Sequence, residues 1–161
     1  MTILLVMAAS LDEIEYYFPD PLCDEALSPA KMRRLKLREG VQFYKLTKEF
    51  TYNSPTKGVI VVPVKFLTDY ASIPRLAQAL IDDDDPTVLY PAIIHDWGYA
   101  TKGAIWGNKY PPLTKKEVDG LLLEGMELLD AAWWKRTAVY QAVNWFGSAA
   151  WNNQNDPVLI S

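Results

Sequence analysis

The pattern of apolar residues changes once along this chain, and that change constrains the fold more than any other feature. Between residues 41 and 66 the sequence is rich in β-branched and aromatic residues that partly alternate with polar ones. After residue 85, apolar residues recur at helical spacing. A chain of 161 residues has room for one domain. We therefore predict an α+β fold, in which a small antiparallel β-sheet is followed by three main α-helices.

The β-rich part predicts one antiparallel hairpin over residues 41–66. Residues 41–52 and 59–66 have strand composition, and the segment 53–58 between them contains Asn, Ser, Pro and Gly, which are typical of turns. Pro63 has no amide hydrogen to donate to a sheet. We therefore expect the second strand to lie at an edge of the sheet, or to be bulged at Pro63.

Acidic residues precede the N-terminus of the first main helix. Four aspartates at 82–85 precede Pro86, and a carboxylate followed by proline is typical of a helix N-terminus. The consecutive carboxylates lack the alternate spacing and the glycine of a calcium-binding loop, so we favour capping over calcium. Pro91 belongs in the first turn of a helix, which predicts a well-formed helix over 90–101.

The next two helices follow a loop rich in glycine and proline. Thr114 and Glu117 form a capping-box pattern, so the second helix begins at Thr114 and runs to about Asp130. The third helix is predicted over 133–151 from its apolar spacing.

We divide the chain into an arm (1–40), a single α+β domain (41–151) and a tail (152–161). Three prolines predict that residues 11–30 of the arm are irregular. A short capped helix follows over 30–38, and its five basic residues form either a solvated face or a binding patch.

Composition excludes several classes of function. The formal net charge of −4 argues against a partner bound through phosphate neutralisation, so we expect no nucleic acid. No run of 18 apolar residues exists, so we expect no transmembrane segment. The single cysteine, Cys23, excludes an intramolecular disulfide and a cysteine-based zinc site.

The only histidine of the chain, His95, is the strongest candidate for chemistry. On a helix, His95 and Tyr99 lie one turn apart on one face, whereas Asp96 points about 100° away from His95. This helix therefore presents an imidazole and a carboxylate to two sides of one cleft.

A second carboxylate, Asp119, lies at the flank of the apolar stripe of the next helix. A partly buried aspartate needs a partner, and antiparallel packing of the two helices makes His95 that partner. A histidine held by a carboxylate is a general base for activating water. Asp96 is then free to bind a hard cation such as Ca²⁺.

A polar cluster directly follows the second predicted strand. It contains a carboxylate and two hydroxyl groups, contributed by Thr68, Asp69 and Ser72. We interpret the cluster either as a network that locks the loop or as the wall of a binding site. Ser72 is a weak candidate nucleophile, because no glycine elbow surrounds it.

These residues resemble a family of phage and prophage proteins, domain of unknown function 1353 (DUF1353). The resemblance rests on Phe66-Leu-Thr-Asp-Tyr-Ala-Ser-Ile-Pro74, on Ala92-Ile-Ile-His-Asp-Trp-Gly-Tyr99 and on an aspartate in a capped helix. It covers about residues 41–151 and implies a viral or prophage origin. Gly98 stands where the family usually has a larger apolar residue, and Lys115 where it usually has arginine. We expect Gly98 to loosen its helix and Lys115 to lose a bidentate contact.

A shorter pattern is similar to secreted calcium-dependent phospholipases. His95, Asp96 and Tyr99 on one helix and Asp119 on a second carry the similarity. It implies that His95 activates water, that Asp96 binds calcium and that Asp119 orients His95.

Two functions are therefore expected from the sequence. The first is a virion-associated phage protein, a tail or capsid component, whose partners are other phage structural proteins or further copies of itself. It would be located in the virion or in the host cytoplasm. The alternative is a hydrolase acting on the host envelope, with His95, Asp119 and Tyr99 as its catalytic residues. An accessible His95 favours the hydrolase, and a sealed one favours the structural protein.

Overall fold

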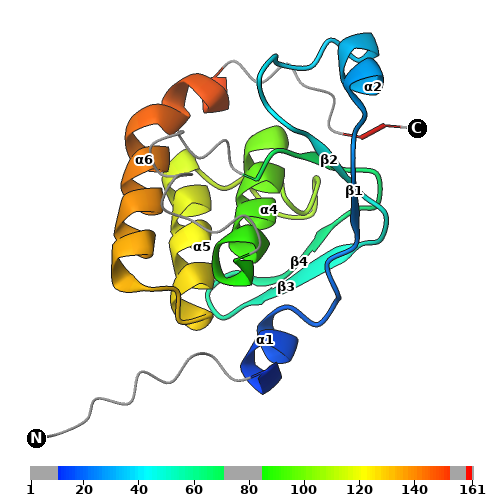
Figure 1. The fold of residues 1–161 in the computed structure, drawn as a ribbon. Helices are drawn as coiled ribbons and strands as arrows, with labels where there is room; N and C mark the ends of the chain where they lie inside the picture. The colour runs from blue at the N-terminus through cyan, green and yellow to red at the C-terminus, as the bar shows by residue number, and fades with distance from the viewer. Residues whose placement is uncertain (1–10, 71–84, 153–158, 161) are drawn as a thin grey trace, which may run out of the picture.

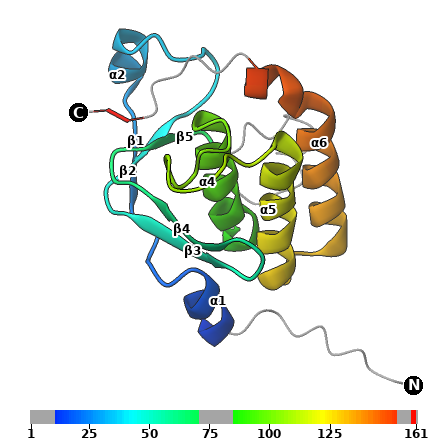
Figure 2. The same cartoon turned by 180° about the vertical axis from the view of Figure 1, so that it is seen from behind.

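Three long helices lie side by side against two small antiparallel sheets in the computed structural model (Figure 1). The structure describes residues 11–70, 85–152, 159 and 160. The helices are α4 (Pro86–Ala100), α5 (Lys115–Leu128) and α6 (Trp133–Asn152), and α4 is the one beside the sheets in both views (Figures 1 and 2). The predicted α+β fold is confirmed. No described helix combines the length and apolar character that crossing a membrane requires.

The predicted hairpin over 41–66 is only partly right, because its first half divides between two sheets. Strands β3 (Phe50–Ser54) and β4 (Gly58–Val62) pair as a hairpin. Residues of β2 (Tyr44–Leu46) instead pair with β1 (Asp24–Ala26) and β5 (Leu67–Thr68), in the order β1-β2-β5. Three exposed polar residues, 47–49, interrupt the strand pattern between β2 and β3.

The β3–β4 hairpin builds the core against α4. Its inward residues, Phe50, Tyr52, Ile60 and Val62, are buried, whereas Val59 and Val61 face outward. Pro63 directly follows β4, and β4 belongs to a two-stranded sheet, so this strand lies at an edge as expected.

The prediction that residues 11–30 are irregular is wrong. Helix α1 (Leu11–Tyr17) and strand β1 form there, because Pro19 and Pro21 lie between these two elements and not inside either. Phe18, directly after α1, is buried and stacks on Tyr52 with the ring centroids 4.6 Å apart.

The short basic helix ends earlier than expected. It is α2 (Pro29–Arg34), and its predicted cap is present, since the Ser28 hydroxyl accepts a hydrogen bond from the Lys31 amide. Lys36 adopts a left-handed conformation (φ 55°), and the Leu37 amide donates to the Met32 carbonyl. This arrangement ends the helix and buries the Leu37 side chain.

Helix α4 begins at Pro86, earlier than the predicted 90–101. Asp85 caps it by accepting a hydrogen bond from the Thr87 amide at 3.0 Å, which confirms the capping prediction for this aspartate. Residues 82–84 lie outside the described residues. Pro91 lies inside the helix and packs on Gly125 of α5, where a Cβ atom would be 2.8 Å from the proline ring. Tertiary packing therefore overrides the preference of Pro91 for a first turn.

Helices α5 and α6 agree with the sequence prediction. The capping box is complete, because the Thr114 hydroxyl accepts from the Glu117 amide while the Glu117 carboxylate accepts from the Thr114 amide. Gly98 of α4 allows α5 to approach closely, since a Cβ atom there would lie 2.4 Å from Val118. Gly98 therefore has a packing role, and the expectation that it loosens its helix stays a prediction.

Candidate functional site

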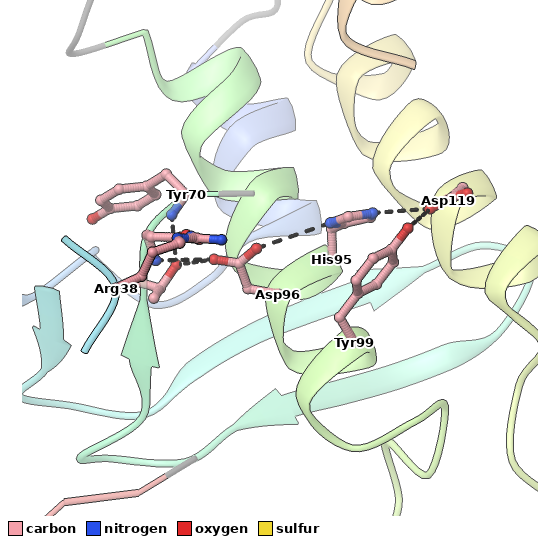
Figure 3. Close-up of polar contacts among 8 residues, drawn as sticks. Arg38, Tyr70, His95, Asp96, Tyr99 and Asp119 are labelled. Atoms are coloured by element: carbon pink, nitrogen blue, oxygen red, sulfur yellow. Dashed lines mark hydrogen bonds and ion pairs between the residues drawn. The ribbon is translucent and has the colours of Figure 1, made fainter. Parts of the chain in front are cut away.

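The structure brings His95 and Asp119 together. His95 comes from the middle of α4 and Asp119 from the first half of α5. The imidazole Nε2 lies 2.9 Å from a carboxylate oxygen, Oδ1, of Asp119 (Figure 3). The His95 residue is 2 % exposed and Asp119 is 1 % exposed, so water does not screen this contact.

Two further side chains hold the Asp119 carboxylate. The Tyr99 hydroxyl donates to Oδ1 at 2.8 Å, as Figure 3 shows, and the Lys115 ammonium donates to Oδ2 at 2.6 Å. Lys115 also donates to the Val143 carbonyl of α6 at 3.2 Å. The lysine therefore contacts both the Asp119 carboxylate of α5 and the backbone of α6. Its spacing of four residues from Asp119 on one helix is the sequence signal for this ion pair.

Helix α6 contributes to this side of the site because Gly147 has no side chain. A Cβ atom at Gly147 would lie 2.3 Å from the Tyr99 hydroxyl oxygen and 3.3 Å from Lys115. Glycine at this position leaves room for both groups that contact Asp119. The apolar spacing that predicted this helix does not indicate this role of Gly147.

The other imidazole nitrogen, Nδ1, is in a different situation. It is buried and has no hydrogen-bond partner among the described residues. The Asp96 oxygen Oδ1 lies 3.9 Å from it, too far for a hydrogen bond but close enough for strong electrostatic interaction. An unsatisfied buried nitrogen is uncommon in a purely structural network.

Asp96 connects His95 to the last residue of β5 and to the residue that follows it. Its second oxygen, Oδ2, accepts a hydrogen bond from the Thr68 hydroxyl at 2.5 Å and from the Asp69 amide at 3.2 Å. The Tyr70 amide donates to the same Thr68 hydroxyl. Two of the predicted loop residues, Thr68 and Asp69, therefore contact the candidate site, while Ser72 lies outside the described residues.

Arg38 is a neighbour that sequence reasoning did not find. Its guanidinium pairs with the Asp69 carboxylate (Figure 3). The residue belongs to the basic segment after α2, and no local pattern links that segment to residue 69.

The pKa values of His95 and Asp119 are shifted in opposite directions. Burial lowers the pKa of the His95 imidazole, but the carboxylates of Asp119 and Asp96 more than offset burial, so the net pKa is raised. Burial raises the pKa of the Asp119 carboxyl, but His95 and Lys115 more than offset this effect, so the net pKa is lowered. The pair therefore favours an imidazolium beside a carboxylate.

The described residues do not form a recognisable cation site at Asp96. No group of three or more His, Cys, Asp or Glu side chains in this part of the chain is arranged to hold a metal ion. Asp96 Oδ2 is already occupied by two hydrogen-bond donors. The calcium role of Asp96 thus stays a prediction that this set of donors does not support, and we derive no step from it.

A protein-family model matches the amino-acid sequence of this chain. Its description is "protein of unknown function (DUF1353)", and the match covers residues 44–143. The chain belongs to the DUF1353 family. The match spans the chain from β2 to Val143 and includes every group that contacts His95 or Asp119. No curated protein and no solved structure matches this member of DUF1353. Its phage origin and its likeness to phospholipases remain predictions.

Proposed function

We propose that this DUF1353 protein is a hydrolase in which His95 is the general base and Asp119 is a positioning residue. The single observation that carries the proposal is the asymmetry of the imidazole. Asp119 holds Nε2 at 2.9 Å, while Nδ1 has no hydrogen-bond partner in the described structure. A base needs one nitrogen fixed and the other unpaired. Because Nδ1 is buried, the proposed reaction also requires an opening of the site that admits water and the ester.

The proposed reaction is the attack of water on an ester. At pH values above the raised pKa of His95, the neutral ring accepts a proton from water at Nδ1. The water oxygen forms a bond to the carbonyl carbon of the ester as the carbonyl π bond opens to an oxyanion, which re-forms the carbonyl when the alkoxide departs. In the resulting imidazolium, the Nε2–H group donates a hydrogen bond to the Asp119 carboxylate, which stabilises the charge. The proton on Nδ1 then passes to the departing alkoxide as the carbon–oxygen bond breaks, which leaves an acid and an alcohol.

The neighbouring residues act through this pair. Tyr99 and Lys115 hold the Asp119 carboxylate, and with it the orientation of the imidazole. Asp96 places a negative charge beside Nδ1 and favours the imidazolium that forms during the reaction. We therefore assign Tyr99 and Asp96 positioning roles, and the catalytic role to His95.

The experiment is an ester hydrolysis assay on the purified full chain. Phospholipid vesicles and a soluble chromogenic ester are the two probes, because the proposed target is the host envelope. We expect His95→Gln to lower the hydrolysis rate at least about 100-fold, in line with the loss of a general base. Lys48→Gln, an exposed position far from α4 in sequence, is the matched control and should retain the wild-type rate.

Two results would overturn the hydrolase. One is the absence of hydrolysis of both probes by the wild-type chain, with EDTA and with added Ca²⁺ alike. The other is equal rates for wild type and His95→Gln, which would mean that any activity belongs to another site or to a contaminant.

Burial of His95 favours a second candidate, a virion-associated structural protein. At 2 % exposure, with the Tyr99 ring centroid 4.1 Å from that of the imidazole, His95 also serves as a lock between α4 and α5. This candidate is tested by fractionating purified phage particles from a strain that carries the gene. Co-purification of the chain at fixed stoichiometry supports it, and complete recovery in the soluble host fraction contradicts it.

A further inference from the structure

The outward face of α6 carries no charge over most of its length. From Thr137 to Asn152 the helix contains no Asp, Glu, Lys or Arg, although 22 % of the chain is charged. An exposed helix normally has charged residues on its solvent face. About four consecutive turns without one are therefore unusual for a surface that only meets water.

The same helix exposes large aromatic side chains. Trp133 is 72 % exposed, Trp145 is 67 % exposed and Phe146 is 66 % exposed. Trp134 is 38 % exposed. Exposed aromatic groups on an uncharged surface are typical of protein–protein interfaces, where tryptophan is among the residues that contribute most to binding.

Trp134 and Trp145 lie in one stripe on the side of α6 opposite its buried residues, and Trp133 and Phe146 lie about 100° to either side of this stripe. Trp134, Gln141, Trp145 and Ser148 recur at intervals of seven, four and three, the spacing of a helix that packs against another helix. Val139, Val143 and Gly147 are the buried residues of α6 and mark its opposite side. Figure 1 shows α6 as the outermost of the three long helices.

We propose that this stripe binds the same stripe of a second copy of the chain, with the two α6 helices antiparallel about a two-fold axis at Gln141. The axis sets Trp145 of one copy against the small residues Thr137 and Ala138 of the other. It likewise sets Trp134 against Ser148 and Ala149. Each large side chain thus meets a small one on the other copy, which is the complementarity that an isologous interface requires.

Charge favours a second copy over other occupants. Because the stripe is uncharged between 137 and 152, two copies of a chain with net charge −4 meet there without bringing like charges together. A helix that binds an anionic membrane surface carries Lys and Arg on its polar face, and this stripe has none in that interval. The proposal is independent of the proposed hydrolase, because no residue of the stripe contacts His95 or Asp119 in the described structure.

Cysteine cross-linking tests the register. In a Cys23→Ser background, Gln141→Cys places two thiols across the two-fold axis, and mild oxidation should yield a disulfide-linked dimer. Asn152→Cys is the matched control, because antiparallel packing separates its two copies by about 33 Å at 1.5 Å rise per residue. Cross-linking at both positions would indicate a parallel pair, and cross-linking at neither would indicate no such contact. Either result overturns the proposal.

Light scattering after size-exclusion chromatography tests the energetics. We expect the wild-type chain to elute as a dimer at micromolar concentration, and Trp145→Glu to weaken dimerisation at least 100-fold. Lys48→Glu, which also adds negative charge at an exposed position, should remain a dimer. Circular dichroism verifies that both variants are folded. A monomeric wild type, or one that instead sediments with neutral phosphatidylcholine vesicles, contradicts self-association through α6.

Discussion

Two carboxylates flank one imidazole in this protein, and they are built differently. Asp119 is 1 % exposed and receives hydrogen bonds from a tyrosine and a lysine besides its contact with His95. The Asp96 side chain is 12 % exposed, and it accepts hydrogen bonds from the Thr68 hydroxyl of β5 and from the Asp69 amide. The first carboxylate fixes the orientation of the ring, whereas the second links the ring to the sheet layer. The two carboxylates therefore have different structural roles, although both are negatively charged.

The largest effect should come from removing the inner carboxylate. We expect Asp119→Ala to lower the free energy of unfolding by about 3–5 kcal/mol, because it leaves Lys115 and His95 without their buried counter-charge. Asp96→Ala should cost less, about 1–3 kcal/mol, since it removes hydrogen bonds at a more exposed position. Urea denaturation of both variants measures the difference. Equal losses would show that the two carboxylates are not distinct.

Substitution of Gly147 on α6 tests the packing around Asp119 without changing a charged residue. Gly147→Ala should cost about 1–3 kcal/mol, because the added Cβ would lie 2.3 Å from the Tyr99 hydroxyl oxygen. Gly120→Ala in α5 is the matched control. Its Cβ would meet nothing within 4 Å, so it should be neutral or stabilising by up to about 1 kcal/mol. Thermal unfolding of the pair reports both values, and a Gly147→Ala protein as stable as the control would refute the close contact.

Removal of the Thr68 hydroxyl tests the hydrogen bonds that Asp96 accepts. Thr68→Val keeps the shape of a residue that is 1 % exposed but removes its hydrogen bond to Asp96, and we expect a cost of about 1–2 kcal/mol. Thr51→Val, on the outward face of β3, should change stability by less than about 0.5 kcal/mol. If both substitutions are silent in chemical denaturation, the link between α4 and β5 is not energetically important.

The dependence of stability on pH probes both carboxylates at once. The folded protein holds the pKa of His95 above its ordinary value of 6.5, so folding favours the protonated ring. This stabilisation is complete below the ordinary pKa and is lost as pH rises through the folded-state pKa, with a slope of at most about 1.4 kcal/mol per pH unit. His95→Gln should abolish that slope. Because the chain has one histidine, its single imidazole NMR signal should titrate above the free-histidine range, and a titration below it would contradict the arrangement.

Local signals in the sequence predicted the helical half of the fold well. The capping box at Thr114 and the aspartate cap at Asp85 are contacts between near neighbours, so their residue types suffice to identify them. The extent of α4 was not predictable in this way. The ring of Pro91 packs on Gly125 of α5, a contact between residues far apart in the sequence that no local pattern contains.

The residues of the candidate site likewise fall into two groups: those that local sequence signals predicted, and those that depend on long-range packing. His95, Tyr99 and Asp119 could be proposed from helical spacing and from the need of a buried aspartate for a partner. The contribution of Gly147 and the approach of Arg38 depend on how distant segments pack, and no local pattern contains that information. The division of the 41–66 segment between two sheets was missed for the same reason, because β1 comes from the predicted irregular arm.

The two close approaches between α4 and α5 have a consequence for how this protein can evolve or be engineered. Pro91 meets Gly125 and Gly98 meets Val118, so the two points of contact are seven residues apart on each helix. Together they fix both the axial position and the rotation of one helix on the other. A slip of one residue along the axis, about 1.5 Å with a turn of about 100°, would carry the imidazole away from its inner carboxylate. Insertions or deletions between these points should therefore be rejected even where they leave every polar side chain intact.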